Sequence, residues 1–95
     1  MAVAVITDVP QGTAEMYDAV SKKLSADGTL ADGQIVHTMG LMEGGGFRVF
    51  DVWETREAFE KFAEERLGPA VDAVVEGQAG EMPDRTIYEL HNVVK

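Results

Sequence analysis

The sequence predicts one α+β domain, residues 1–95, in which a four-stranded antiparallel sheet carries two helices on one face. Four short apolar or alternating segments have the character of strands, and two longer segments have apolar residues at helical spacing. Their order along the chain is βαββαβ. The two middle strands are joined by Met42-Glu43-Gly44-Gly45-Gly46, which is short enough for an antiparallel hairpin. This order, with a central hairpin, is the ferredoxin-like arrangement.

The first half of the chain supplies a strand and a helix. Residues 2–7 are short, apolar and β-branched, which predicts a buried strand. Thr13 can cap a helix, because its hydroxyl can accept a hydrogen bond from a free backbone N–H of the first turn. The apolar stripe of this helix is Tyr17, Val20 and Leu24. We expect Asp27-Gly28 to end it.

The second half supplies the hairpin, the second helix and the last strand. Residues 34–41 and 47–54 are the hairpin strands, and Thr55 caps the helix that follows. The apolar face of that helix is Phe59, Phe62, Ala63, Leu67 and Ala70. We expect Gly68-Pro69 to kink or interrupt the helix, since proline removes a backbone donor. Residues 86–94 form the last strand.

The composition excludes several classes of partner. Eight basic residues against seventeen acidic ones give a net charge of −9, which disfavours nucleic acid and anionic membranes. The absence of cysteine excludes disulfides, a thiolate nucleophile and cysteine-based metal sites. No apolar run approaches the roughly 20 residues of a spanning helix. The N-terminus lacks the basic region of a signal peptide, so we expect a cytoplasmic protein.

The uncovered face of such a sheet predicts a partner. Two helices cover one side of a four-stranded sheet, and the other side of this sheet is too apolar to remain in water. A chain of only 95 residues also gains from added burial. We therefore expect a homodimer in which a second copy covers the open face.

The segment VFDVWETREAFEKFAEERLGPAV, residues 49–71, is similar to the dimeric α/β-barrel superfamily. This group includes antibiotic-biosynthesis monooxygenase domains and stress-responsive barrel proteins. A strand ending in Trp-Glu, a Ser/Thr cap and an Ala-Phe pair opening the second helix are typical of it. The resemblance implies a dimeric barrel over the whole chain. Its members include cofactor-free oxygenases of polyketide-like aromatics, haem-degrading enzymes, isomerases and proteins with no known reaction.

The haem-degrading branch fits this sequence poorly. Its members carry a histidine ligand on the second helix, about ten residues after a helical Trp. Aligned on Trp53-Glu54, these positions hold Phe62 and Asp72, and neither predicted helix contains a histidine. No spacing of histidines and carboxylates supports a metal site either. We therefore expect no metal and no resident cofactor, and haem or metal binding remains the least favoured reading.

The hairpin loop sets a register that brings possible chemistry together. The expected pairs are Leu41–Phe47, Met39–Val49, His37–Asp51 and Ile35–Trp53. This places an imidazole opposite a carboxylate and beside the only indole, on the same sheet face. We expect that face to be the open one, with Phe50 and Val52 turned toward the helices. A shift of one residue in the hairpin register would separate His37 from Asp51. A histidine on an apolar strand face is more often a packed residue satisfied by one hydrogen bond than a catalyst.

A His–Asp pair can act as a general base, because the carboxylate fixes the imidazole tautomer and raises its basicity. We therefore take His37 and Asp51 as candidate catalytic residues. The candidate substrate-binding residues are Trp53, His91, Ile35, Met39, Val49 and Phe62. His91 is placed either at the pocket mouth or at the dimer seam.

Two functions remain open on these residues. The first is a homodimer that binds a small apolar or aromatic molecule and acts on it as a cofactor-independent oxygenase or cyclase. The alternative is a non-catalytic ligand-binding or stress-associated module with the same cavity.

Overall fold

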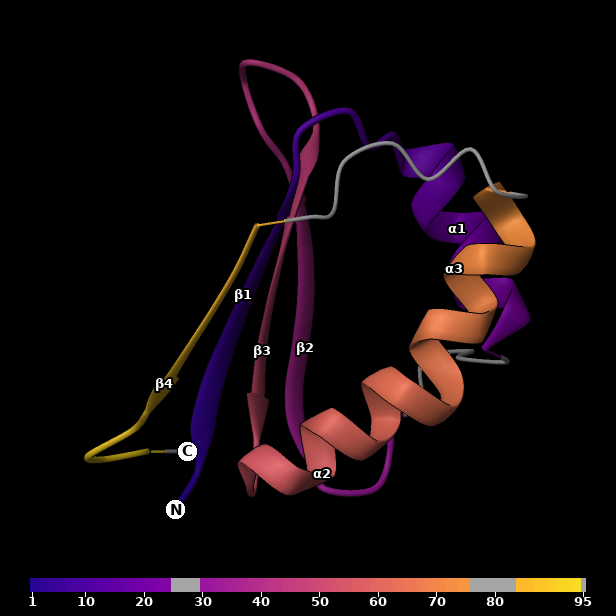
Figure 1. The fold of residues 1–95 in the computed structure, drawn as a ribbon. Helices are drawn as coiled ribbons and strands as arrows, with labels where there is room; N and C mark the ends of the chain where they lie inside the picture. The colour runs from indigo at the N-terminus through magenta and orange to yellow at the C-terminus, as the bar shows by residue number, and fades with distance from the viewer. Residues whose placement is uncertain (25–29, 76–83, 95) are drawn as a thin grey trace.

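The computed structural model describes residues 1–24, 30–75 and 84–94. Its elements are β1 (Val3–Val9), α1 (Ala14–Lys23), β2 (Gln34–Leu41), β3 (Phe47–Trp53), α2 (Arg56–Phe62), the π-helical segment η1 (Ala63–Leu67), α3 (Gly68–Val75) and β4 (Asp84–Glu89). The strands form one antiparallel sheet in the order β2-β3-β1-β4. Figure 1 shows the helices in a second layer on one side of this sheet. The predicted ferredoxin-like α+β fold is confirmed.

The glycine-rich hairpin fixes the pairing of β2 with β3. Gly45 and Gly46 have φ angles of 100° and 83°, which only glycine adopts without strain. The resulting register sets His37 opposite Asp51, as predicted. The pairing of Ile35 with Trp53 is wrong, because a β-bulge places Gln34 there instead. Ile35 is the extra residue of that bulge, and a local change of this kind leaves no trace in strand periodicity.

The second helix changes its geometry where the sequence indicates an interruption. A π-helical turn covers Ala63–Leu67 and leads directly into α3 at Gly68-Pro69. The Gly68 N–H donates to the Ala63 carbonyl, five residues back. Because Pro69 has no N–H, regular α-helical bonding cannot pass this point, and the wider turn accommodates the missing donor. The helix therefore bends and continues, with its two arms visible in Figure 1.

The core lies between the sheet and α2. Val3, Val5, Trp53 and Phe59 form its buried centre. The Trp53 ring contacts Phe59 and Phe62, with centroids 5.7 and 5.2 Å apart. Trp53 and the other β3 residues of its face, including Asp51, therefore point toward the helices. The prediction that this row of β3 lies on the open face is wrong, because the row lies under the helices.

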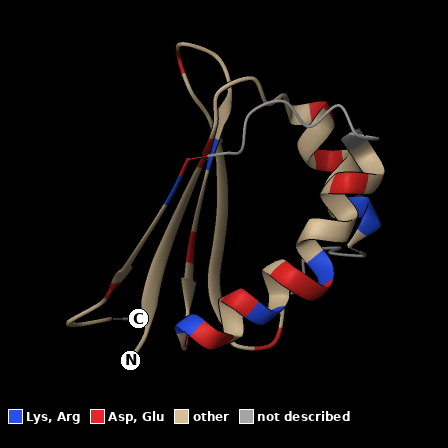
Figure 2. Ribbon diagram, viewed as in Figure 1, with Lys and Arg blue, Asp and Glu red and all other residues tan. Residues whose placement is uncertain are grey.

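The prediction failed because it assigned the row that contains polar residues to the open face, and a polar residue can be buried when it is hydrogen-bonded. Asp51 is only 7% exposed, yet its carboxylate is hydrogen-bonded, and paired polar groups are tolerated in an interior. The alternate residues Phe50 and Val52 point to the open face, with Ile6 from β1 beside them. Figure 2 shows the charged residues concentrated on the helices and the strands largely uncharged. The open face carries apolar side chains across its middle and the Asp8–Arg48 ion pair at one end.

The last strand differs from its predicted bounds. β4 begins at Asp84 and ends at Glu89, so His91 lies in the segment that follows the strand. The predicted helix end at Asp27-Gly28 lies outside the described residues. Among the helices that the structure describes, none is long and apolar enough to cross a membrane.

Candidate functional site

The predicted His–Asp pair is formed between β2 and β3. The His37 Nδ1 and Asp51 Oδ1 atoms are 2.7 Å apart. β2 is an edge strand and β3 is central, so the carboxylate is buried while the imidazole stays partly exposed. Because Asp51 accepts from Nδ1–H, a neutral His37 carries its proton on Nδ1 and has its lone pair on Nε2. The pair thus has the tautomer of a general base.

The electrostatics of the pair agree with this geometry. The hydrogen bond that His37 donates to Asp51 raises the pKa of His37 above its ordinary value of 6.5, and partial burial of the ring opposes the increase. A raised pKa makes the neutral imidazole a stronger base. The imidazole can act as a base only at a pH that leaves it unprotonated.

A third residue, Tyr17, joins the His–Asp pair. The sequence pattern had placed Tyr17 on the apolar stripe of the first helix. The Tyr17 hydroxyl lies at a short hydrogen-bonding distance from His37 Nε2. Thr13 caps α1 by accepting from the Met16 N–H at 3.1 Å, which starts the helix so that Tyr17 lies in its first turn over the sheet. The Tyr17 ring also packs edge-on against Phe47, with centroids 5.8 Å apart.

Gly12 permits this close approach of α1. A Cβ atom there would lie 2.3 Å from the Phe47 ring, so a larger residue would displace the chain that leads into the helix. Sequence reasoning could have found Tyr17, since it is the only polar member of the helix stripe, but not its partner on a distant strand.

Trp53 belongs to the core and not to an open pocket wall. Its exposed fraction is 0%, and its indole Nε1 has no hydrogen-bond partner among the residues that the structure describes. A buried N–H without a partner costs about 1–3 kcal/mol, so this group is a donor available to an acceptor that enters the interior. Phe62 packs on the Trp53 ring from α2 and is partly buried.

Arg85 is a second residue that sequence reasoning missed. It lies on β4 opposite Thr7, and its Nε donates to the Thr7 hydroxyl at 3.2 Å. Its guanidinium carbon lies 5.2 Å from the Phe59 ring centroid. Burial lowers the pKa of Arg85, and the charge of Asp51 opposes that change. A cation thus lies on the same sheet face as the His–Asp pair, on an exposed residue of the edge strand, and no carboxylate of the described residues forms an ion pair with it.

The remaining predicted lining residues divide into two groups. Met39 and Val49 lie in one row with Thr7 and Arg85, on the helix side. Val49 and Thr7 stay partly exposed although their strands are central. Ile35 is half-buried at the bulge. His91 is exposed after β4 and lies away from the pair in the sheet register.

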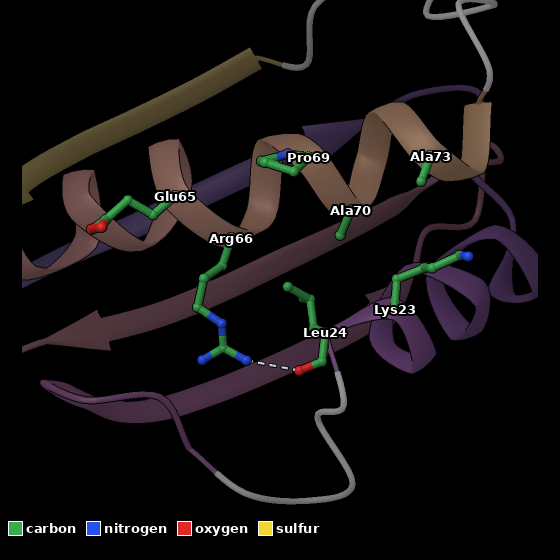
Figure 3. A pocket seen from close by; sticks show the side chains of 7 residues that line it. All are labelled: Lys23, Leu24, Glu65, Arg66, Pro69, Ala70 and Ala73. Atoms are coloured by element: carbon green, nitrogen blue, oxygen red, sulfur yellow. Dashed lines mark hydrogen bonds between the residues drawn. The ribbon is translucent and has the colours of Figure 1, made fainter.

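A separate groove lies between the end of α1 and the η1–α3 helix. Its volume is about 420 Å³, and Figure 3 shows its lining, which is Lys23, Leu24, Glu65, Arg66, Pro69, Ala70 and Ala73. Arg66 closes one side by donating to the Leu24 carbonyl at 2.8 Å. None of the predicted site residues lines this groove. We place the candidate site at Tyr17, His37 and Asp51, because a linked set of ionisable groups carries chemistry that an open groove does not.

Metal ligation has no candidate within the described part of the chain. No group of three or more His, Asp or Glu residues there is arranged to hold an ion.

The fold defines the class of protein to which the chain is similar. Its sheet order and helix placement are those of the ferredoxin-like proteins of the antibiotic-biosynthesis monooxygenase group, as the sequence resemblance implied. No family model and no curated sequence match the chain significantly.

Three solved structures illustrate the similarity. Rv0793 from Mycobacterium tuberculosis has a TM-score of 0.71 and 16% identity, with 100% of both chains covered. A proposed antibiotic biosynthesis monooxygenase from Deinococcus radiodurans has a TM-score of 0.65 and 20% identity, covering 100% of this chain and 97% of that one. SnoaB from Streptomyces nogalater, a cofactor-independent oxygenase, has a TM-score of 0.64 and 16% identity, covering 98% and 95%. At these identities the similarity is one of fold.

Proposed function

We propose that the protein binds a small, largely apolar or aromatic molecule between its sheet and helices and acts on it without a cofactor. The observation that carries the proposal is the His37–Asp51 hydrogen bond on the helix side of the sheet, 2.7 Å long. It pairs a basic imidazole with a buried carboxylate beside a row of half-buried apolar side chains. The cofactor-independent oxygenase SnoaB shares this fold, which makes oxygenation the first reaction to test.

The chemistry begins with removal of a proton. His37, backed by Asp51, takes a proton from a phenol or an activated C–H of the ligand, and the electron pair stays on the ligand as an enolate or phenolate. Arg85 lies on the same sheet face and stabilises that negative charge. The electron-rich anion then reacts with molecular oxygen, or with a carbonyl of its own in a cyclisation. Met39, Val49 and Phe62 supply the apolar surroundings, Trp53 lies in the core, and His91 and Ile35 are the least supported members of the lining.

The alternative function is a non-catalytic ligand-binding module. One observation favours it: both nitrogens of His37 are engaged, Nδ1 by Asp51 and Nε2 by Tyr17. Such a set of bonds also ties α1 to the sheet, which is a structural role. The two functions differ in whether a bound ligand is turned over.

We further propose that the working form is a cytoplasmic homodimer. The open sheet face presents Ile6, Val36 and Phe50 on one surface, and an apolar sheet face of this kind is usually covered. A second copy of the chain has the matching surface by symmetry.

The test uses anthrone, an aromatic ketone whose methylene hydrogens are acidic. One anthrone and one oxygen molecule give one anthraquinone and one water, so an oxygen electrode and absorbance follow the same reaction. We expect turnover in the wild type, loss of it in His37→Ala, and a lower rate with a shifted pH profile in Asp51→Asn. Trp53→Ala removes a fully buried core ring, so it should destabilise the fold by about 3–5 kcal/mol. Asp72→Asn, which changes an exposed carboxylate on α3, is the matched control and should leave the rate unchanged.

Two results would redirect the proposal. Binding of anthrone, seen as a change in Trp53 fluorescence, without oxygen uptake would favour the binding module. Turnover that survives His37→Ala would mean that the pair is structural and that the chemistry lies elsewhere.

A further inference from the structure

We propose that Tyr17, and not His37, is the group that touches the reacting hydrogen of the ligand, with His37 and Asp51 behind it as a proton relay. This inference rests on the proposed function and assigns the atom of the same site that faces the substrate, the Tyr17 Oη.

The first argument is the occupancy of the imidazole. His37 Nδ1 donates to Asp51, and His37 Nε2 accepts from the Tyr17 hydroxyl. A ligand proton therefore has no free nitrogen to reach unless the phenol is displaced. The hydrogen-bonded series Asp51–His37–Tyr17 ends at Tyr17 Oη. This oxygen keeps acceptor capacity after it has donated its own proton.

The second argument is the position of the carboxylate in the hydrogen-bonded series Asp51–His37–Tyr17. Asp51 is 7% exposed, the His37 side chain is 35% exposed, and Tyr17, on α1, is partly buried. The fixed negative charge is thus the most buried member, where it stabilises an imidazolium most effectively. The hydroxyl lies at the opposite end of the series from this carboxylate.

The third argument is the fixed position of the Tyr17 ring. It packs edge-on against Phe47, which is 6% exposed and which the Gly12 turn allows to approach closely. This contact, worth about 0.5–1.5 kcal/mol beyond the buried area, holds the hydroxyl on His37 Nε2. The ligand of the proposed function remains a weak C–H or O–H acid attached to an aromatic ring.

The proton step balances without a further reactant. The ligand proton passes to Tyr17 Oη while the Tyr17 proton passes to His37 Nε2, and the electron pair of the broken bond stays on the ligand. The products are a ligand anion and an imidazolium that still donates to Asp51. If the proton returns to a different ligand atom, the result is a tautomer, and no oxidant is consumed. Proton transfer can thus be measured apart from oxygenation.

The experiment follows deuterium entry into the methylene group of anthrone under nitrogen, by proton NMR in heavy water. The protein is compared as wild type, Tyr17→Phe, His37→Ala and Tyr88→Phe. Tyr88 is the matched control, since it is the only other tyrosine and is 45% exposed on β4. We expect Tyr17→Phe and His37→Ala each to lower the exchange rate about 100-fold or more, the usual range for loss of a general base, and Tyr88→Phe to leave it unchanged.

The outcomes separate this inference from the function on which it rests. If Tyr17→Phe exchanges as fast as the wild type or faster while His37→Ala is inactive, His37 acts directly, and the inference is overturned while the function stands. Exchange by the wild type no faster than in buffer overturns both.

A second measurement reads the Tyr17 hydroxyl directly. N-acetylimidazole acetylates tyrosine when the phenol oxygen bonds to the acetyl carbon, imidazole leaves, and the phenol proton passes to a base. With His37 as that base, Tyr17 should be acetylated at least about 10-fold faster in the wild type than in His37→Ala, and mass spectrometry of peptides measures both rates. Tyr88, on the open sheet face, should react at the same rate in the two proteins. A Tyr17 rate that His37→Ala leaves unchanged would contradict the relay.

Discussion

Phe59→Ala should be strongly destabilising, and its effect can be worked out from the structure. Phe59 is 4% exposed and packs between the sheet and α2, edge-on to Trp53 at 5.7 Å. Removing a ring that buries on the order of 150 Å² costs about 4 kcal/mol at 25 cal/mol per Å². Phe→Ala changes in protein cores cost about 3–5 kcal/mol, which agrees with this figure.

The size of this loss matters because small domains have little stability to spare. At about 0.05–0.15 kcal/mol per residue, the whole chain is stable by roughly 5–14 kcal/mol. The variant should therefore lose about a third or more of the total, and a urea midpoint should fall by roughly 2.5 M for an m-value of about 1.5 kcal/mol per M.

The assay is urea unfolding at one fixed protein concentration, followed by far-UV circular dichroism and by Trp53 fluorescence. Phe62→Ala is the matched control: this ring also contacts Trp53 but is only partly buried, so its loss should be smaller, about 2 kcal/mol. A Phe59→Ala loss below about 1.5 kcal/mol, or one smaller than that of Phe62→Ala, would refute the placement of the core between the sheet and α2.

The remaining predictions concern the His–Asp pair and the open face. Asp51→Asn should lower the pKa of His37, because the hydrogen bond to a charged partner is its main cause, and NMR titration of the two histidines measures this. Since the folded pKa of His37 is raised, its stabilising contribution is complete below the ordinary value of 6.5 and is lost as the pH rises through the folded pKa. The melting temperature of His37→Gln should therefore differ most from the wild type at acidic pH and least at high pH; the opposite trend would contradict the pairing. Light scattering should give about twice the chain mass of 10.3 kDa, and Phe50→Asp should give the single-chain mass with the helix content retained. A wild type that scatters as a single chain would exclude the dimer.

The sequence by itself determined the elements of this protein and one decisive register. The Thr13 and Thr55 caps, the two periodicities and the Gly44–Gly46 connection were enough to predict two helices, four strands and a hairpin that sets His37 opposite Asp51. These features are local, because caps and tight turns depend on residues within a few positions of one another.

Only the tertiary structure decided which face of the sheet the helices cover. A strand period of two separates residues into two faces, but it does not say which face is inside when both are largely apolar. The packing of Trp53 on α2 settles this and carries Asp51 into the interior. Tyr17 and Arg85 join the site for the same reason: each lies far along the chain from His37 and Asp51. Folding alone brings the α1 and β4 residues to them, because no local pattern encodes which distant side chain will complete a hydrogen bond.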